Sequence, residues 1–223
     1  MNVRLKTPRP YRSSLRDAQS AQTRERIFMA AKAFLETGDF ENLTLRRIAE
    51  LADVSAPTVY AHFPTMDDLS RAFFFWLKPH IGTDMALPPL SDFAAIPQRM
   101  FPRYARHGRL LRNLMNTPAW DKLRIDDWKT KQDGWAGAIK AALPNLTARQ
   151  TDRAAIALAA FSTPGVWRWL VDIAGCSEAE AEQIAAWATG ALAAALMRDA
   201  GGLGATEAAT PRKTTSRKKG ASS

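Results

Sequence analysis

The chain has 223 residues, of which 46 % are hydrophobic and 24 % charged, a composition typical of globular proteins that can build a sizeable core. Lys and Arg number 31 against 22 Asp and Glu, so the formal net charge is +9. Residues 1–16 and residues 208–223 each hold five cations and no acid, which leaves the rest of the chain close to neutral. One cysteine, Cys176, excludes an internal disulfide and a cysteine-rich zinc site, and with them the disulfide-stabilised secreted proteins.

Membrane insertion and secretion are not expected from the sequence. No uncharged run reaches the roughly 18 residues that indicate a membrane span. The basic N-terminus is not followed by an apolar region, so it does not have the pattern of a signal peptide. We therefore expect a cytoplasmic protein without a transmembrane helix.

The two basic ends differ in composition from the body of the chain. Residues 1–20, with two prolines and several cations, are predicted to be a flexible basic arm, and residues 200–223 a disordered basic tail. Between them, apolar residues recur at helical spacing without the alternation typical of strands, which predicts an all-α fold.

The first helices have clear beginnings and ends. A helix over about 21–37 carries one apolar stripe, and Gly38 is its expected C-terminal cap. Thr44 is the expected N-cap of a short helix that ends near Ala52, and Ser55 that of a second one over about 56–62 with Pro57 in its first turn. Thr65 with Asp68 resembles a capping box and begins a helix that runs to Pro79. The apolar stripe of the first helix consists of Ile27, Ala30, Ala31, Phe34 and Leu35, and that of the second of Leu45, Ile48, Ala49 and Ala52.

The C-terminal half is predicted to be helical over about 91–106, 109–116, 121–142, 147–174 and 177–199. Pro164 is expected to kink or divide the fourth of these helices. Thr147 with Gln150 and Ser177 with Glu180 have the spacing of capping boxes. The last helix is apolar over most of its circumference, so it needs partners on more than one side.

Two short helices joined by a tight turn have the spacing of a helix-turn-helix, whose second helix fits the DNA major groove. The segment LTLRRIAELADVSAPTVYAHFPTMDDL, from Leu43 to Leu69, resembles the DNA-binding region of the TetR/AcrR family of transcriptional regulators. The resemblance extends over roughly residues 21–78. It implies about nine helices, a three-helix DNA-binding domain over 21–80, and a larger helical domain over 81–199 that forms a homodimer and binds an effector.

The resemblance also implies which residues meet DNA. Thr44 and Arg46 are expected to bind backbone phosphates, since helix N-termini and guanidinium groups do so. The start of the second short helix is expected to reach base edges, and its later residues to touch phosphates. The candidates on that helix and its cap are Ser55, Ala56, Pro57, Thr58, Tyr60 and His62. As alternatives, Thr44 and Ser55 are only helix caps and Tyr60 belongs partly to the core.

Two positions depart from the family pattern. Asp53 stands where the family commonly has Gly in the turn, so it must adopt a left-handed conformation. Met66 stands where the family usually has Lys, which removes one phosphate contact. We hypothesise that the N-terminal arm replaces it, because basic arms enter the minor groove beside a recognition helix. The basic tail is either a further DNA contact or an inert solubilising segment.

Large apolar residues of the second domain are weak candidates for lining an effector pocket, although such residues at helical spacing are more often plain core. They are Trp76, Met100, Phe101, Tyr104, Met115, Trp120, Trp128 and Trp135. The helices at 147–174 and 177–199 are apolar nearly all round, as a four-helix bundle across a two-fold axis requires.

Catalysis, metal binding and a cofactor are not expected. The three histidines lack the spacing of paired metal ligands, and no nucleophile, phosphate-loop or dinucleotide motif occurs. The adjacent pairs Asp67–Asp68 and Asp126–Asp127 are interpreted as a helix cap and a solvated face. The sequence thus predicts a dimeric repressor that a small, hydrophobic effector releases from a palindromic operator. The alternative is a regulator whose second domain mediates only dimerisation or protein interaction.

Overall fold

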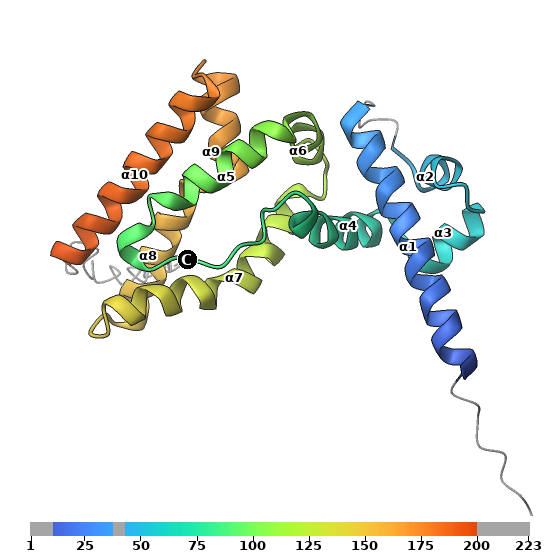
Figure 1. The fold of residues 1–223 in the computed structure, drawn as a ribbon, viewed down its shortest axis with the longest axis horizontal. Helices are drawn as coiled ribbons and strands as arrows, with labels where there is room; N and C mark the ends of the chain where they lie inside the picture. The colour runs from blue at the N-terminus through green and yellow to red at the C-terminus, as the bar shows by residue number, and fades with distance from the viewer. Residues whose placement is uncertain (1–10, 38–42, 200–223) are drawn as a thin grey trace, which may run out of the picture.

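The computed structural model describes residues 11–37 and 43–199. Within these ranges every regular element is a helix and no strand occurs, which confirms the expected all-α fold. Helices α1 (Tyr11–Thr37), α2 (Leu45–Leu51) and α3 (Ala56–His62) form one end of the molecule. Helix α4 (Met66–His80) connects this end to the remaining helices (Figure 1).

Helix α1 begins ten residues earlier than predicted, so the expectation of a flexible arm over 1–20 is wrong for residues 11–20. This segment contains neither Pro nor Gly, and half of its residues, the Arg, Leu, Ala and Gln, form helices readily. Extending an existing helix avoids the cost of nucleation, so the helix continues beyond the part that packs on the core. Residues 1–10, Gly38 and the tail over 200–223 lie outside the described residues.

The apolar stripes of α1 and α2 pack together as predicted. Ile27 and Ile48 are fully buried, and Val59 of α3 joins them in the same core. Phe34 of the predicted stripe is half-buried. The aromatic residues Phe63 and Phe73 complete this core at the junction with α4.

The second half begins with a 3₁₀ turn, η2 (Leu90–Asp92), and continues through α5 (Ala95–Arg106), α6 (Gly108–Met115) and α7 (Trp120–Ala142). It ends with α8 (Ala148–Ala160), α9 (Pro164–Arg168), the π-helical turn η3 (Trp169–Ile173) and α10 (Glu178–Arg198). Helix α5 packs against α10, and α7 packs against α8. The capping boxes of Thr147 with Gln150 and of Ser177 with Glu180 are confirmed.

One helix boundary differs from the sequence prediction, and the break predicted at Pro164 is confirmed. The helix expected from about residue 91 begins at Ala95, because the preceding residues form the turn η2. The helix expected over 147–174 is divided, since Thr163 caps a new helix that starts at Pro164, where the missing N–H costs nothing.

One stretch of the described residues, Ala148–Ile173, is long and apolar enough by length and composition to cross a membrane, and 39 % of its most apolar 18-residue window is buried inside the protein. Its helix α8 buries Ala154, Ala155 and Leu158 in the core. Core helices of soluble proteins share this composition, so the stretch is weak evidence for a membrane span.

Candidate nucleic-acid interface and ligand pocket

Side-chain caps define both helices of the helix-turn-helix. The hydroxyl of Thr44 accepts a hydrogen bond of 3.1 Å from the backbone N–H of Arg47 and begins α2. The hydroxyl of Ser55 accepts one of 3.3 Å from Thr58 N–H and begins α3. Both caps match the prediction, and each cap satisfies a backbone donor that would otherwise lack a partner.

The turn between the two helices has the expected left-handed residue. Asp53 adopts φ of 51°, a conformation that Asp tolerates better than most residues. Arg26 of α1 holds this turn by donating hydrogen bonds of 2.7 Å to the carbonyl of Ala52 and 2.6 Å to that of Asp53. Its guanidinium also lies 3.2 Å from the Asp53 carboxylate. The role of Arg26 was not predictable from the sequence, because the contact depends on how α1 crosses the turn.

Five of the eight candidate DNA contacts in and beside α2 and α3 are exposed. Thr44, Arg46, Ser55, Pro57 and Tyr60 are exposed, and the Tyr60 side chain retains half of its accessible surface. The remaining candidates, Ala56, Thr58 and His62, are half-buried. The hydroxyls of Ser55 and Thr58 lie 2.7 Å apart, so the capping role of Ser55 and its polar surface coexist.

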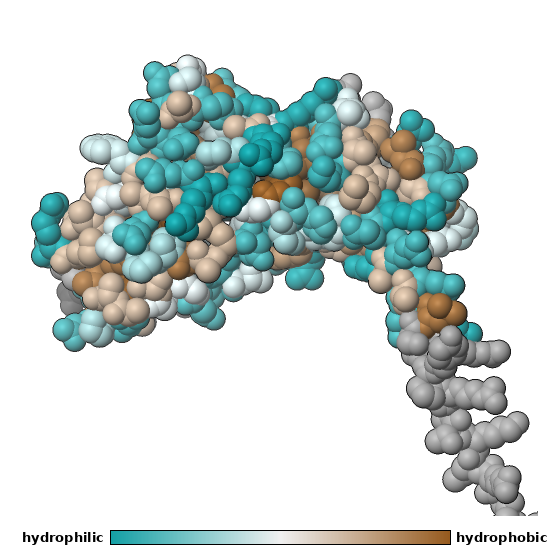
Figure 2. All heavy atoms as spheres, viewed as in Figure 1, coloured by the Kyte–Doolittle hydropathy of each residue, from teal (hydrophilic) through white to brown (hydrophobic). Residues whose placement is uncertain are grey.

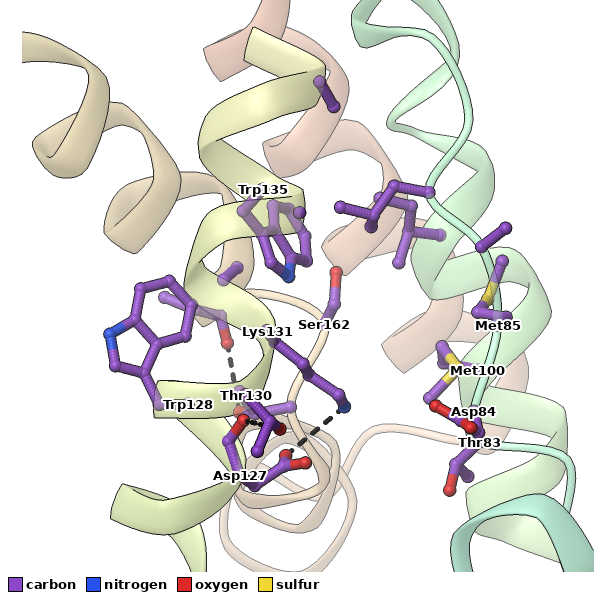
Figure 3. Close-up of a pocket in the computed structure, with 18 of the residues that line it drawn as sticks. Thr83, Asp84, Met85, Met100, Asp127, Trp128, Thr130, Lys131, Trp135 and Ser162 are labelled. Carbon is purple, nitrogen blue, oxygen red and sulfur yellow. Dashed lines mark hydrogen bonds and ion pairs between the residues drawn. The ribbon is translucent and has the colours of Figure 1, made fainter. Parts of the chain in front are cut away.

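A second feature is a cavity of about 740 Å³ in the larger part of the molecule. Its walls come from α7, α5, the segment 83–87 and the connection between α8 and α9 (Figure 3). Four of the eight predicted lining residues border it, namely Met100, Tyr104, Trp128 and Trp135. The cavity size lies within the range of small-molecule sites.

The other four predicted lining residues lie elsewhere. Trp120 borders a smaller adjoining space of about 40 Å³, which shares Met100 and Tyr104 with the cavity wall, and Phe101 and Met115 pack in or against the core. Trp76 lies between α1 and α4. Its indole N–H donates a hydrogen bond of 2.8 Å to the carboxylate of Glu25, and its ring stacks on that of His80. Sequence spacing identifies these side chains as internal but does not indicate which of them border empty space.

The cavity also has a charged wall that the sequence analysis missed. Asp127 is only 2 % exposed, so its interpretation as part of a solvated face is wrong. Its carboxylate lies 2.7 Å from Lys78 Nζ, 2.9 Å from the Arg124 guanidinium and 3.3 Å from Lys131 Nζ. Burial raises the pKa of Asp127, but these cations outweigh it and lower the pKa below its ordinary value.

Two of these cations lie at sequence spacings that hinted at the cluster. Arg124 and Lys131 are three and four residues from Asp127 on α7, where side chains share one helix face. Lys78 comes from α4, and only the tertiary fold brings it to the same carboxylate.

Hydrogen bonding orders the far side of the cavity. The Tyr104 hydroxyl donates a hydrogen bond of 2.9 Å to the backbone carbonyl of Ser162, and burial raises the pKa of that phenol. In the described part of the chain, no group of three or more His, Cys, Asp or Glu side chains has an arrangement that could hold a metal ion.

Comparison with known proteins finds a family match in the helix-turn-helix region. Residues 27–73 match the model of bacterial regulatory proteins of the tetR family. No curated protein matches the chain.

Two solved structures resemble the whole fold. A tetR-family transcriptional regulator from Streptomyces coelicolor is 16 % identical with a TM-score of 0.56, over 82 % of this chain and 86 % of that one. A protein from Pseudomonas aeruginosa PAO1, described as a transcriptional regulator, is 18 % identical with a TM-score of 0.54, over 80 % of this chain and 93 % of that one. Residues 27–73 are thus similar to the tetR family of bacterial regulatory proteins, and the described part of the chain has the all-α fold of TetR-family transcriptional regulators.

Proposed function

We propose that this protein is a cytoplasmic, homodimeric transcriptional repressor that a small, largely apolar effector releases from a palindromic operator. Residues 11–80 supply the DNA-reading domain and residues 81–199 the dimerisation and effector domain. The observation that carries the proposal is the pairing of an exposed, capped helix-turn-helix with a cavity of about 740 Å³ whose charged wall is tied to α4.

The exposed surface of α2 and α3 supports DNA recognition. Arg46 is exposed and its guanidinium lies 4.0 Å from the carboxylate of Glu50, its one ion-pair partner among the described residues, so the guanidinium is accessible to a phosphate. Thr58, near the start of α3, is the polar candidate for base contact, and Ala56 and Pro57 offer apolar contact to thymine methyl groups. Tyr60 and His62 lie further along the same helix as candidate phosphate contacts.

Helices α8 and α10 support the dimer. One side of α10 buries small residues against the protein, yet the opposite side leaves Ile184 and Trp187 exposed. An apolar groove of about 260 Å³ lies between α8 and α10, lined by residues such as Leu158 and Leu192. On the face drawn in Figure 2, apolar residues form a broad area at the end of the molecule away from α1. Covering such an area by a two-fold-related copy buries the same surface on both subunits.

The cavity favours ligand binding over the alternative of a purely protein-interacting second domain. Helix α4 links ligand binding in the cavity to DNA binding. Lys78 of α4 binds Asp127 of the cavity wall, and α4 leads directly from the helix-turn-helix. A ligand that changes the position of α4 changes the spacing of the two recognition helices in the dimer. DNA and effector then oppose each other through reciprocal coupling.

Selection of bound sequences from a random DNA pool with the purified protein tests this proposal. We expect a palindromic site whose half-sites lie about one helical turn apart or a multiple of it. Recovery of no sequence preference contradicts specific regulation, and a single unrepeated half-site contradicts the dimer. Thermal-shift screening with hydrophobic compounds separates the two alternatives for the second domain, because a ligand of the native state raises the melting temperature.

A further inference from the structure

We propose that the effector is an amphipathic organic acid, whose carboxylate binds at Lys131 and Ser162 while its apolar body lies against Trp135 and Met100. This inference deepens the proposed function and rests on it, since it assigns a chemical class to the ligand of the same cavity. It revises the expectation of a purely hydrophobic effector.

The first observation is an excess of positive charge at the cavity wall. Lys78, Arg124 and Lys131 converge on the single buried carboxylate of Asp127. A second carboxylate, Asp84, lies 3.9 Å from Lys78 and is largely exposed. Three cations and two carboxylates leave one positive charge beside an apolar cavity, where an unbalanced charge is costly and a bound anion stabilises it.

Lys131 is the cation best placed to meet a ligand. Its Nζ is the farthest of the three from Asp127, at 3.3 Å, whereas Lys78 lies at 2.7 Å and is more deeply buried. Figure 3 shows the Lys131 side chain extending from α7 into the space between α7 and α5. Burial lowers the pKa of Lys131 in spite of the attraction of Asp127, so its charged form gains from a further negative neighbour.

Ser162 provides a second and independent observation. It lines the same cavity and is only 8 % exposed, yet its hydroxyl has no hydrogen-bond partner among the described residues. The bond from Tyr104 to the Ser162 carbonyl fixes the position of this residue. A buried hydroxyl without a partner is unfavourable, and a ligand carboxylate accepts its hydrogen bond.

The remainder of the cavity is suited to an apolar body. Flexible Met85 and Met100 lie across the space from Trp135, so the wall adapts to ligands of different shape (Figure 3). The other apolar side chains of the wall are Leu87, Ile96, Trp128 and Ile156. The ligand therefore combines one acidic group with a hydrocarbon or aromatic body.

Isothermal titration calorimetry of the full chain with matched probes tests the assignment. The probes are decanoate against 1-decanol and 2-naphthoate against 2-naphthalenemethanol, each pair differing in the acidic group. We expect at least one acid to bind about tenfold or more tightly than its alcohol, as one charge-assisted hydrogen bond provides. Lys131→Met abolishes this preference without weakening the alcohol, and the control Lys129→Met, an exposed lysine of the same helix, retains it.

Three results overturn the inference: no binding of either acid, alcohols that bind as tightly as the acids, or a preference that persists in Lys131→Met. The comparison of acid with alcohol in the unsubstituted protein decides the matter even if Lys131→Met does not fold. Fluorescence anisotropy of a selected operator then tests the proposed function separately. Acid binding without DNA release rejects the effector mechanism and retains the ligand class, whereas release by alcohols alone rejects the ligand class and retains the mechanism.

Discussion

Lys78 and Asp127 join the helix that leaves the DNA-reading domain to the wall of the ligand cavity, with Lys78 Nζ 2.7 Å from a carboxylate oxygen of Asp127. Lys78 lies near the end of α4 and Asp127 in the first half of α7. In the proposed mechanism, a change at the cavity wall acts through this contact on α4, the helix that follows the helix-turn-helix.

Removing the charge of Asp127 is expected to destabilise the protein. Asp127→Asn leaves three cations around a neutral side chain, so we expect the free energy of unfolding at pH 7 to fall by about 3 kcal/mol. The pKa of Asp127 is lowered in the folded state, so its contribution is complete well above the reference pKa of 3.8 and is lost as pH falls through the lower folded value. Urea unfolding from neutral to acidic pH should show the difference between variant and parent narrowing below about pH 5.

The matched control for this series is Asp133→Asn, an exposed carboxylate on the same helix. It should change stability by less than about 0.5 kcal/mol. Equal effects of the two substitutions would contradict the role assigned to the buried cluster.

Two substitutions on the proposed DNA-binding surface test its affinity for DNA and its sequence preference separately. Arg46→Ala should weaken binding to all sequences and reduce the slope of log affinity against log salt by about 1, because it removes one phosphate contact. Thr58→Ala should instead relax the preference at one position of each half-site, since it removes a base contact. Anisotropy titrations with Arg149→Ala, an exposed arginine of α8, serve as the control; an unchanged slope for Arg46→Ala would refute its contact.

The N-terminal segment offers a test of sequence-independent affinity. Deleting residues 2–16 removes five cations and no acid, while the buried part of α1 begins only at Ile27. Operator affinity should fall and its salt dependence should become shallower, by up to about 0.9 in slope for each cation that contacts a phosphate. Unchanged affinity across the salt range would reject the arm as a replacement for the phosphate contact missing at Met66.

Trp187 tests the proposed dimer surface. Its side chain is 75 % exposed on α10, so a charged substitution costs the isolated subunit little. Trp187→Asp should raise the dimer dissociation constant by at least tenfold, because a central Trp is typically worth about 2 kcal/mol or more at an interface. Analytical ultracentrifugation measures the effect, and Ile125→Asp, an exposed apolar residue of α7, is the control. A dimer that persists in Trp187→Asp excludes this face.

The turn of the helix-turn-helix permits a clean test of backbone strain. Asp53→Gly and Asp53→Ala both remove the exposed ion pair with Arg26, but only Gly adopts a φ of 51° without cost. The Gly variant should therefore be more stable than the Ala variant by about 1 kcal/mol in urea unfolding. Equal stabilities would show that the turn rearranges when the carboxylate is lost.

Much of the N-terminal structure could be predicted from short sequence patterns. Thr44 and Ser55 cap the helices that the sequence indicated, and Asp53 takes the left-handed conformation that the turn required. These features depend on backbone hydrogen bonds a few residues apart, so sequence spacing suffices to predict them. The early start of α1 was missed, because the two prolines and the cations over residues 1–20 were interpreted as an arm.

Which side chains line the cavity depends on contacts between residues that are far apart in the sequence. Its apolar side chains were partly predicted, but only the packing of α5 against α7 distinguishes Trp135, which borders empty space, from Phe101, which fills the core.

The sequence alone determined the all-α fold, the capped helix-turn-helix and the concentration of positive charge at the two ends of the chain. The tertiary structure decided that Asp127 is buried and that Lys78, distant in sequence, neutralises it together with Arg124 and Lys131. The sequence pattern around a carboxylate in a helix is the same whether the side chain faces water or a cavity. The spacing of Arg124 and Lys131 along α7 is visible in the sequence, but the contact of Asp127 with Lys78 arises only when α4 and α7 pack together.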